Sequence, residues 1–139
     1  MVLLTEGPID VAALRAAVTA PRFGAVLVFE GVARDTFEGR RVTHLAYEAW
    51  APVALETLEA IRQEAETRWG CALALAHRTG EVPVTEASVV IAVGAPHRAE
   101  CYEASRFAID TLKERVPIWK KEHYEDGSAW KANAPAGDR

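Results

Sequence analysis

The chain has only two cysteines, Cys71 and Cys101, among 139 residues. A domain of this length buries enough apolar surface to fold without a disulfide or metal staple, so we expect free thiols in a reducing, cytoplasmic setting. Its longest apolar runs, around residues 25–29 and 89–93, are far shorter than the roughly 20 residues that span a bilayer. The first residues show no basic leader and no cleavage-type segment, so we expect no secretory signal and no membrane partner.

Positive charge is also scarce. Sixteen Lys and Arg stand against 20 Asp and Glu, which gives a net charge of -4. Proteins that bind nucleic acid are usually basic overall, so we expect no nucleic-acid partner. The net charge does not exclude a local basic pocket. Half of the residues are apolar and 26% are charged, the balance of a soluble globular protein. We therefore expect one domain over residues 1–133 and a loose tail at 134–139.

The motifs of several enzyme classes are missing. No two glycines lie two positions apart, which excludes the dinucleotide fingerprint, and neither a phosphate-binding P-loop nor a Gly-x-Ser-x-Gly elbow is present. Only His97 and Cys101 share a metal-like helical spacing, so we expect no metal and no cofactor. A Cys101–His97 nucleophile pair is an alternative. Because Cys101 falls on the apolar stripe of a predicted helix, core packing is the favoured interpretation.

Apolar periodicity and turn residues predict three helices among short strands. The predicted helices run from the Asp10 cap to Pro21, from Pro52 to Gly70, and from about His97 to Arg115. The predicted strands are Val2–Thr5, Gly24–Ala33, Val42–Glu48, Ala72–His77, Ser88–Val93 and Ile118–Tyr124, with a hairpin turn at Asp126-Gly127. Because short connections join neighbouring strands, we expect an α+β fold with a mixed sheet and three helices.

The third predicted helix divides into three sectors at about 100° per residue. Its buried sector contains Cys101, Tyr102, Ala104, Ser105, Ala108, Ile109 and Leu112, and its solvated sector Glu100, Glu103, Asp110 and Glu114. Arg98, Arg106 and Lys113 line the border of the apolar sector, a position that suits cations facing an anionic ligand. The alternative is ordinary surface pairing, such as Arg106 with Asp110 four residues on.

Two adjacent lysines follow this helix beside a large aromatic residue. In an extended segment, Lys120 and Glu122 point to one face, and Trp119 and Lys121 point to the other. A lysine crowded by cations can act as acid, base or nucleophile, whereas an ordinary charged edge strand is the simpler alternative. Arg34 emerges from the apolar strand at 24–33, where it can hold a phosphate or carboxylate. The residues alone thus indicate an anion pocket.

Five motifs occur in a characteristic order between residues 23 and 130. They are Phe29-x-Gly31-x-x-Arg34, His77-Arg78-x-Gly80, Ala95-Pro96-His97-Arg98-Ala99-Glu100, Phe107-Ala108-Ile109-Asp110-x-Leu112-Lys113 and Val116-Pro117-Ile118-Trp119-Lys120-Lys121-Glu122. Together they resemble the MoaE family, the large, catalytic subunits of molybdopterin synthase. The resemblance implies an α+β fold with a hammerhead-like strand arrangement. It also implies a sulfurtransferase of molybdenum cofactor biosynthesis, which converts cyclic pyranopterin monophosphate into the molybdopterin dithiolene.

The resemblance also implies the site residues. Lys113 and Lys120 match the family's functional lysines. The matching substrate-pocket positions are Val32, Ala33, Arg34, His97, Arg98, Lys121 and Glu122. Position 32 is basic in some relatives, whereas Val32 brings no charge here. Arg40 and Arg41 have no such match and stay unassigned.

A partner follows from the same resemblance: a small sulfur-carrier subunit with a C-terminal Gly-Gly thiocarboxylate, in a heterotetramer around a central homodimer. The chain ends without Gly-Gly, so we expect it not to be the carrier itself. Arg98 and Lys113 lie fifteen positions apart, about 22 Å along a helix. If both serve one site, His97 and Arg98 should come from a symmetry-related copy. A non-catalytic module that binds an anion or a partner's tail is the alternative function.

Overall fold

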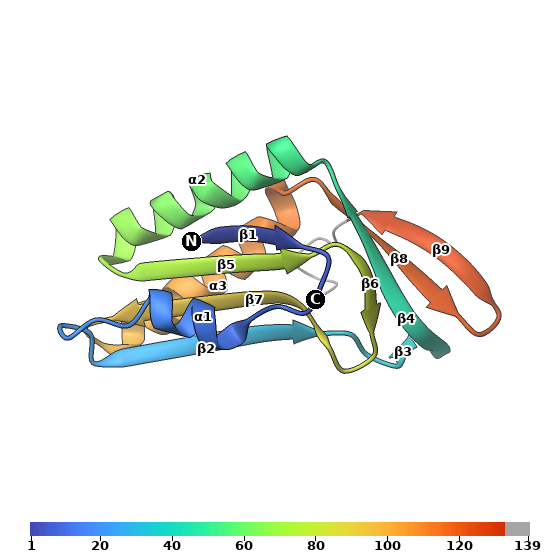
Figure 1. Cartoon of the computed structure of the whole chain (residues 1–139), viewed down its shortest axis with the longest axis horizontal. Helices are drawn as coiled ribbons and strands as arrows, with labels where there is room; N and C mark the ends of the chain where they lie inside the picture. The colour runs from blue at the N-terminus through green and yellow to red at the C-terminus, as the bar shows by residue number, and fades with distance from the viewer. Residues whose placement is uncertain (133–139) are drawn as a thin grey trace.

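The computed structural model describes residues 1–132, in which three helices and nine strands form one α+β domain (Figure 1). The helices are α1 (Val11–Ala17), α2 (Ala51–Trp69) and α3 (Arg98–Arg115). The strands are β1 (Val2–Thr5), β2 (Ala25–Val32), β3 (Thr36–Phe37), β4 (Arg40–Ala49), β5 (Ala72–Arg78), β6 (Gly80–Pro83), β7 (Ala87–Ala95), β8 (Ile118–Tyr124) and β9 (Gly127–Ala132). The predicted α+β class and the three predicted helices are confirmed. The tail predicted at 134–139 lies outside the described residues, and the domain boundary at 133 stays a prediction.

The strands form two sheets, where the sequence predicted one mixed sheet. The first has the order β1-β5-β7-β2, and only β1 and β5 run parallel. The second joins β3, β4, β8 and β9, with β6 paired to β4. Figure 1 shows the second sheet standing at the end of the first sheet where β2 finishes and β7 begins. That junction brings the residues after β2 close to β8.

The first sheet is covered on both faces. Helices α2 and α3 pack on one face, and α2 contributes the fully buried side chains Ala54, Leu58, Ile61 and Ala65, the inner face that its periodicity predicts. Helix α1 covers the other face with Leu14 and Val18. The C-terminal end of α1 lies so close to β7 that a Cβ on Gly94 would meet the Val18 carbonyl oxygen at 1.8 Å. Only glycine permits this approach. No helix in residues 1–132 is long and apolar enough to span a membrane.

Two segments that lie between predicted strands, residues 34–41 and 78–87, contain short strands that were not predicted. The charged loop at 34–40 forms a hairpin in which β3 returns through Glu38 and Gly39, both at positive φ. The connection around Gly80 and Pro83 contains β6, which pairs with β4. Neither segment is long enough to show a period of two, so each becomes a strand only through its pairing with β4.

Most of the predicted buried sector of α3 is confirmed, because Cys101, Ala104, Ser105, Ala108 and Leu112 are buried, but the edges of the sector differ. Tyr102, predicted to be buried, is 63% exposed, whereas Thr111 is buried. The carboxylate of Glu100, predicted to be solvated, has its Oε2 atom buried. The side of the helix that carries Ile109 and Lys113 borders a cavity, and Ile109 is only partly buried against the core. Lys113, predicted at the border of the apolar sector, thus lines the cavity.

Candidate active site

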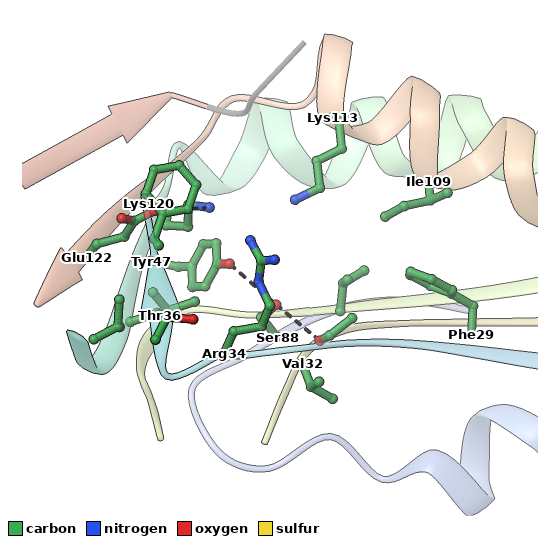
Figure 2. A pocket seen from close by; sticks show the side chains of 15 residues that line it. Phe29, Val32, Arg34, Thr36, Tyr47, Ser88, Ile109, Lys113, Lys120 and Glu122 are labelled. Carbon is green, nitrogen blue, oxygen red and sulfur yellow. Dashed lines mark hydrogen bonds and ion pairs between the residues drawn. The ribbon is translucent and has the colours of Figure 1, made fainter. Parts of the chain in front are cut away.

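A cavity of about 240 Å³ lies where the second sheet meets β2, β7 and α3 (Figure 2). Arg34 reaches it from just beyond β2, Lys113 from the last turn of α3 and Lys120 from β8. Figure 2 shows Lys113 and Arg34 extending toward each other from opposite sides, with Lys120 at a third side. The apolar part of the wall is Phe29, Val32, Phe37, Val42, Leu45, Val89 and Ile109. Three cations from separate segments of the fold thus share one hollow, as an anion pocket requires.

Local backbone structure explains how each cation is placed at the cavity. Strand β2 has a register shift between Gly31 and Val32, its last residue paired with β7, and Arg34 follows two residues later in the lining of the cavity. Helix α3 ends at Arg115, two residues before Pro117, which leaves Lys113 in the last turn above the cavity. The alternation of β8 then sends Lys120 to the same cavity.

Lys120 is held between a carboxylate and an aromatic ring. Its Nζ lies 3.5 Å from Oε1 of Glu122 and 5.6 Å from the centroid of the Phe37 ring. Glu122 is only 1% exposed. The predicted facing is confirmed, because Lys120 and Glu122 line the cavity while Trp119 is exposed outside its lining. The ammonium group is therefore oriented by neighbours on two elements.

The polar floor of the cavity was not predicted. The Tyr47 hydroxyl donates to Ser88 Oγ at 3.4 Å, and the Ser88 hydroxyl donates to the Gly31 carbonyl at 3.3 Å. Burial raises the pKa of Tyr47, so its phenol stays protonated at neutral pH. Tyr47 and Ser88 both occupy inward positions of their strands, and this alternation was the only feature of the sequence that could have placed them at the cavity.

Four of the predicted site residues do not line this cavity. His97 and Arg98 are exposed at the opposite end of α3, and Lys121 lies on the other face of β8. Ala33 is buried, and its N–H and C=O are bonded to the backbone of Glu86 and Thr85. One chain thus brings together five of the predicted residues: Val32, Arg34, Lys113, Lys120 and Glu122. The roles of all nine stay predictions.

The alternative sites have structural explanations. Cys101 is buried with its Sγ near the carbonyls of Ala25 and Val93, and burial raises the pKa of its thiol, which supports core packing. Arg106 is an exposed partner of Asp110 at 3.8 Å, the surface pair that the sequence left open. Within residues 1–132, no three His, Cys, Asp or Glu side chains gather as metal ligands.

A second hollow of about 530 Å³ lies on the other side of Tyr47. It is lined by Leu4, Thr5, Glu6, Tyr47, Glu48, Ala49, Ala51, Thr79 and Gly80. This lining carries two carboxylates and, among the residues that the structure describes, no lysine or arginine. The hollow is therefore unsuited to an anion, and the cationic cavity is the candidate site.

His77 packs against Tyr47, which lines the cavity, and its burial is expected to make the stability of the fold depend on pH. It packs edge-on against the Tyr47 ring, and its Nδ1–H donates to the Arg78 carbonyl at 2.8 Å. Complete burial is the main reason that its pKa falls from 6.5 to about 4, and the charge of Lys113 adds to the effect. Between these two pH values, the His77 imidazole is protonated in the unfolded chain and neutral in the folded chain. The unfolding free energy therefore falls as the pH drops from about 6.5 to about 4.

We expect His77 to contribute on the order of 3 kcal/mol to this acid destabilisation, the equivalent of a pKa difference of about 2.5. Urea unfolding at pH 7.5 and pH 4.5 measures the contribution. His77→Gln should lose less stability between the two pH values than the unsubstituted chain, whereas the exposed-site control His97→Gln should lose as much. Parallel stability curves for His77→Gln and the unsubstituted chain would contradict the assignment.

The fold and the cavity together define a class: a small α+β domain with a cationic, partly apolar cavity between its two sheets. The family model described as MoaE protein matches residues 4–115, which is more than half of the chain. The chain belongs to the MoaE family.

Individual relatives agree. The chain is 46% identical to a molybdopterin synthase catalytic subunit of Halalkalibacterium halodurans over 91% of this chain and 82% of that protein. The crystal structure of molybdopterin synthase from Staphylococcus aureus has a TM-score of 0.89 at 39% identity, covering 92% of this chain and 94% of that chain. A complex of subunits 1 and 2 of molybdopterin-converting factor from Helicobacter pylori has a TM-score of 0.79 at 21% identity, over 96% of this chain and 92% of that chain, and shows likeness of fold alone.

Proposed function

We propose that the chain is the catalytic subunit of a molybdopterin synthase and transfers two sulfurs to cyclic pyranopterin monophosphate, forming the molybdopterin dithiolene. The chain is a sulfur-transferring enzyme of molybdenum cofactor biosynthesis, in keeping with its family and with relatives named molybdopterin synthase catalytic subunit. Its expected compartment is the cytoplasm.

The observation that carries this proposal is the meeting of Arg34, Lys113 and Lys120 in one cavity. A thiocarboxylate sulfur and a cyclic phosphate are both anionic, and two such charges 4 Å apart repel by about 4 kcal/mol at an effective dielectric constant of 20. Preorganised cations offset this repulsion and stabilise the departing phosphate oxygen. Lys113 gives acid–base or covalent assistance at the reacting carbon, Lys120 holds the incoming sulfur or the substrate, and Arg34 binds the phosphate.

The sulfur donor is a separate small subunit whose C-terminal Gly-Gly thiocarboxylate enters the cavity as an extended tail. Phe29 and Val32 support this route, because both line the cavity and are exposed, which gives an apolar rim for a glycine tail. The Helicobacter pylori structure, which has the same fold, is itself a complex of two subunits of molybdopterin-converting factor.

A second copy of the chain supplies His97 and Arg98. Both are predicted to bind substrate, yet they lie at the start of α3 while Lys113 lies in its last turn, about 22 Å away along the helix. In a homodimer that places the start of each α3 beside the cavity of the other copy, both cavities receive His97 and Arg98 from the partner. With one small subunit for each cavity, the assembly is a heterotetramer.

Reconstitution tests the proposal. The purified chain is mixed with a thiocarboxylated small subunit and cyclic pyranopterin monophosphate, and dithiolene formation is measured. We expect product only when all three components are present, with the small subunit released as a carboxylate. Stable complex formation without product would instead favour a non-catalytic module that binds an anion or a tail.

A further inference from the structure

Glu122 is the buried carboxylate of the site, and its two oxygens have different neighbours. Oε1 lies 3.5 Å from the Lys120 ammonium, and Oε2 accepts a hydrogen bond from the Tyr124 hydroxyl. All three side chains come from alternate positions of β8, so they form a row on one face of the strand. Lys120 and Glu122 line the cavity, whereas Tyr124 stands behind them.

Tyr124 is itself fixed from the other side. It is buried, and the guanidinium carbon of Arg40 lies 3.5 Å from the centroid of its ring. Arg40 is tied in turn to Asp126 at 2.6 Å in the turn between β8 and β9. The stacked guanidinium and the hairpin therefore hold the phenol ring in place, which fixes the direction of its hydroxyl.

We propose that Tyr124 is a positioning residue of this site, because its hydroxyl holds Oε2 of Glu122 so that Oε1 faces the Lys120 ammonium. The catalytic consequence rests on the proposed function, whereas the arrangement of the three groups does not. Tyr124 touches neither the cavity nor a reacting atom, so it acts only through Glu122.

The protonation state of Tyr124 suits this role. Burial and the neighbouring Glu122 carboxylate raise its pKa to about 12, with a further contribution from Glu38, while Arg40 acts in the opposite direction. The phenol is therefore a permanent hydrogen-bond donor near neutral pH. Without it, the carboxylate of Glu122 loses a donor in a buried position, where an unmade bond is costly, and it turns to find another. Lys120 then loses its fixed partner.

The arrangement is tested first without any substrate. The pKa of Tyr124, followed by NMR of tyrosine labelled in the ring, should fall by about one unit or more in Glu122→Gln, because the carboxylate charge is gone. Exchange of the Lys120 ammonium protons at neutral pH should accelerate several-fold in Tyr124→Phe, which keeps the ring and removes only the hydroxyl. Tyr102→Phe removes an exposed phenol elsewhere on the chain and should leave this exchange unchanged. Unaltered Tyr124 titration or unaltered Lys120 exchange would overturn the proposal.

The kinetic test uses the reconstituted enzyme. Tyr124→Phe should lower kcat about tenfold with little change in KM for the small subunit, since a misplaced lysine affects the reaction more than docking. In a Glu122→Gln background, the same substitution should cause no further loss, because its effect passes through the carboxylate. Equal losses in both backgrounds would overturn the proposal. If the unsubstituted enzyme makes no product, the proposed function fails, and the NMR comparison still decides the role of Tyr124.

Discussion

Lys113→Ala should lower dithiolene formation by about 10²–10⁴-fold, the range for loss of a positioned acid or base. The side chain extends from α3 into the cavity opposite Arg34, at the place where we put the reacting carbon. In the proposed assembly the small subunit contacts more of the chain than this one side chain, so we expect its affinity to change much less than turnover. Single-turnover measurements with saturating small subunit separate the two effects.

Two further variants define what Lys113 does. Arg115→Ala removes one positive charge from the same end of α3, where Arg115 is an exposed partner of Glu64 at 3.1 Å, and it should stay within about twofold of full activity. Lys113→Arg keeps the charge but cannot give up its proton near neutral pH. Low activity in Lys113→Arg indicates proton transfer or covalent assistance, and high activity indicates charge stabilisation alone. A near-normal rate for Lys113→Ala would refute the assigned role.

The parts of the site that the sequence could predict depend on local rules. Pro117 ends α3 and begins an extended segment, so the alternation of β8 places Lys120 and Glu122 on one face. The apolar run of β2 ends where Arg34 begins the next segment. The inner face of α2 follows from its helical spacing in the same way. In each case, neighbours within a few residues decide the direction of the side chain.

The parts that the sequence could not predict depend on contacts between distant segments. Strands β3 and β6 exist because β4 offers them a free edge, and neither has a pattern of its own. The hydrogen bond of Tyr47 to Ser88 spans 41 positions and joins two sheets. The error at Tyr102 has the same origin, because helical spacing shows which residues share a side of α3 but not that the cavity lies beside Ile109. Polar partners across sheets leave no periodic signal in the chain.

A subunit-mixing experiment tests whether the site is shared between two copies of the chain, and it is also expected to give a large effect. Arg98→Ala and Lys113→Ala should each be nearly inactive alone, yet a mixture that has exchanged subunits should recover activity. In a mixed dimer, one composite site carries both substitutions and the other carries neither. With equal amounts and random pairing, half of the dimers are mixed, so about one quarter of all sites are intact. We therefore expect about a quarter of the unsubstituted activity in the coexpressed mixture, and about half in mixed dimers isolated through two different affinity tags.

The matched control for this experiment is a mixture of Lys113→Ala with Lys120→Ala. Both lysines line the cavity of the same chain, so every site in a mixed dimer lacks one of them and no activity should return. Recovery only in the mixture that contains Arg98→Ala means that the start of α3 serves the cavity of a second copy. Equal behaviour of the two mixtures would contradict the shared site. Arg98 would then have to act at a place other than the cavity that holds Lys113, because the length of α3 separates the two residues within one chain.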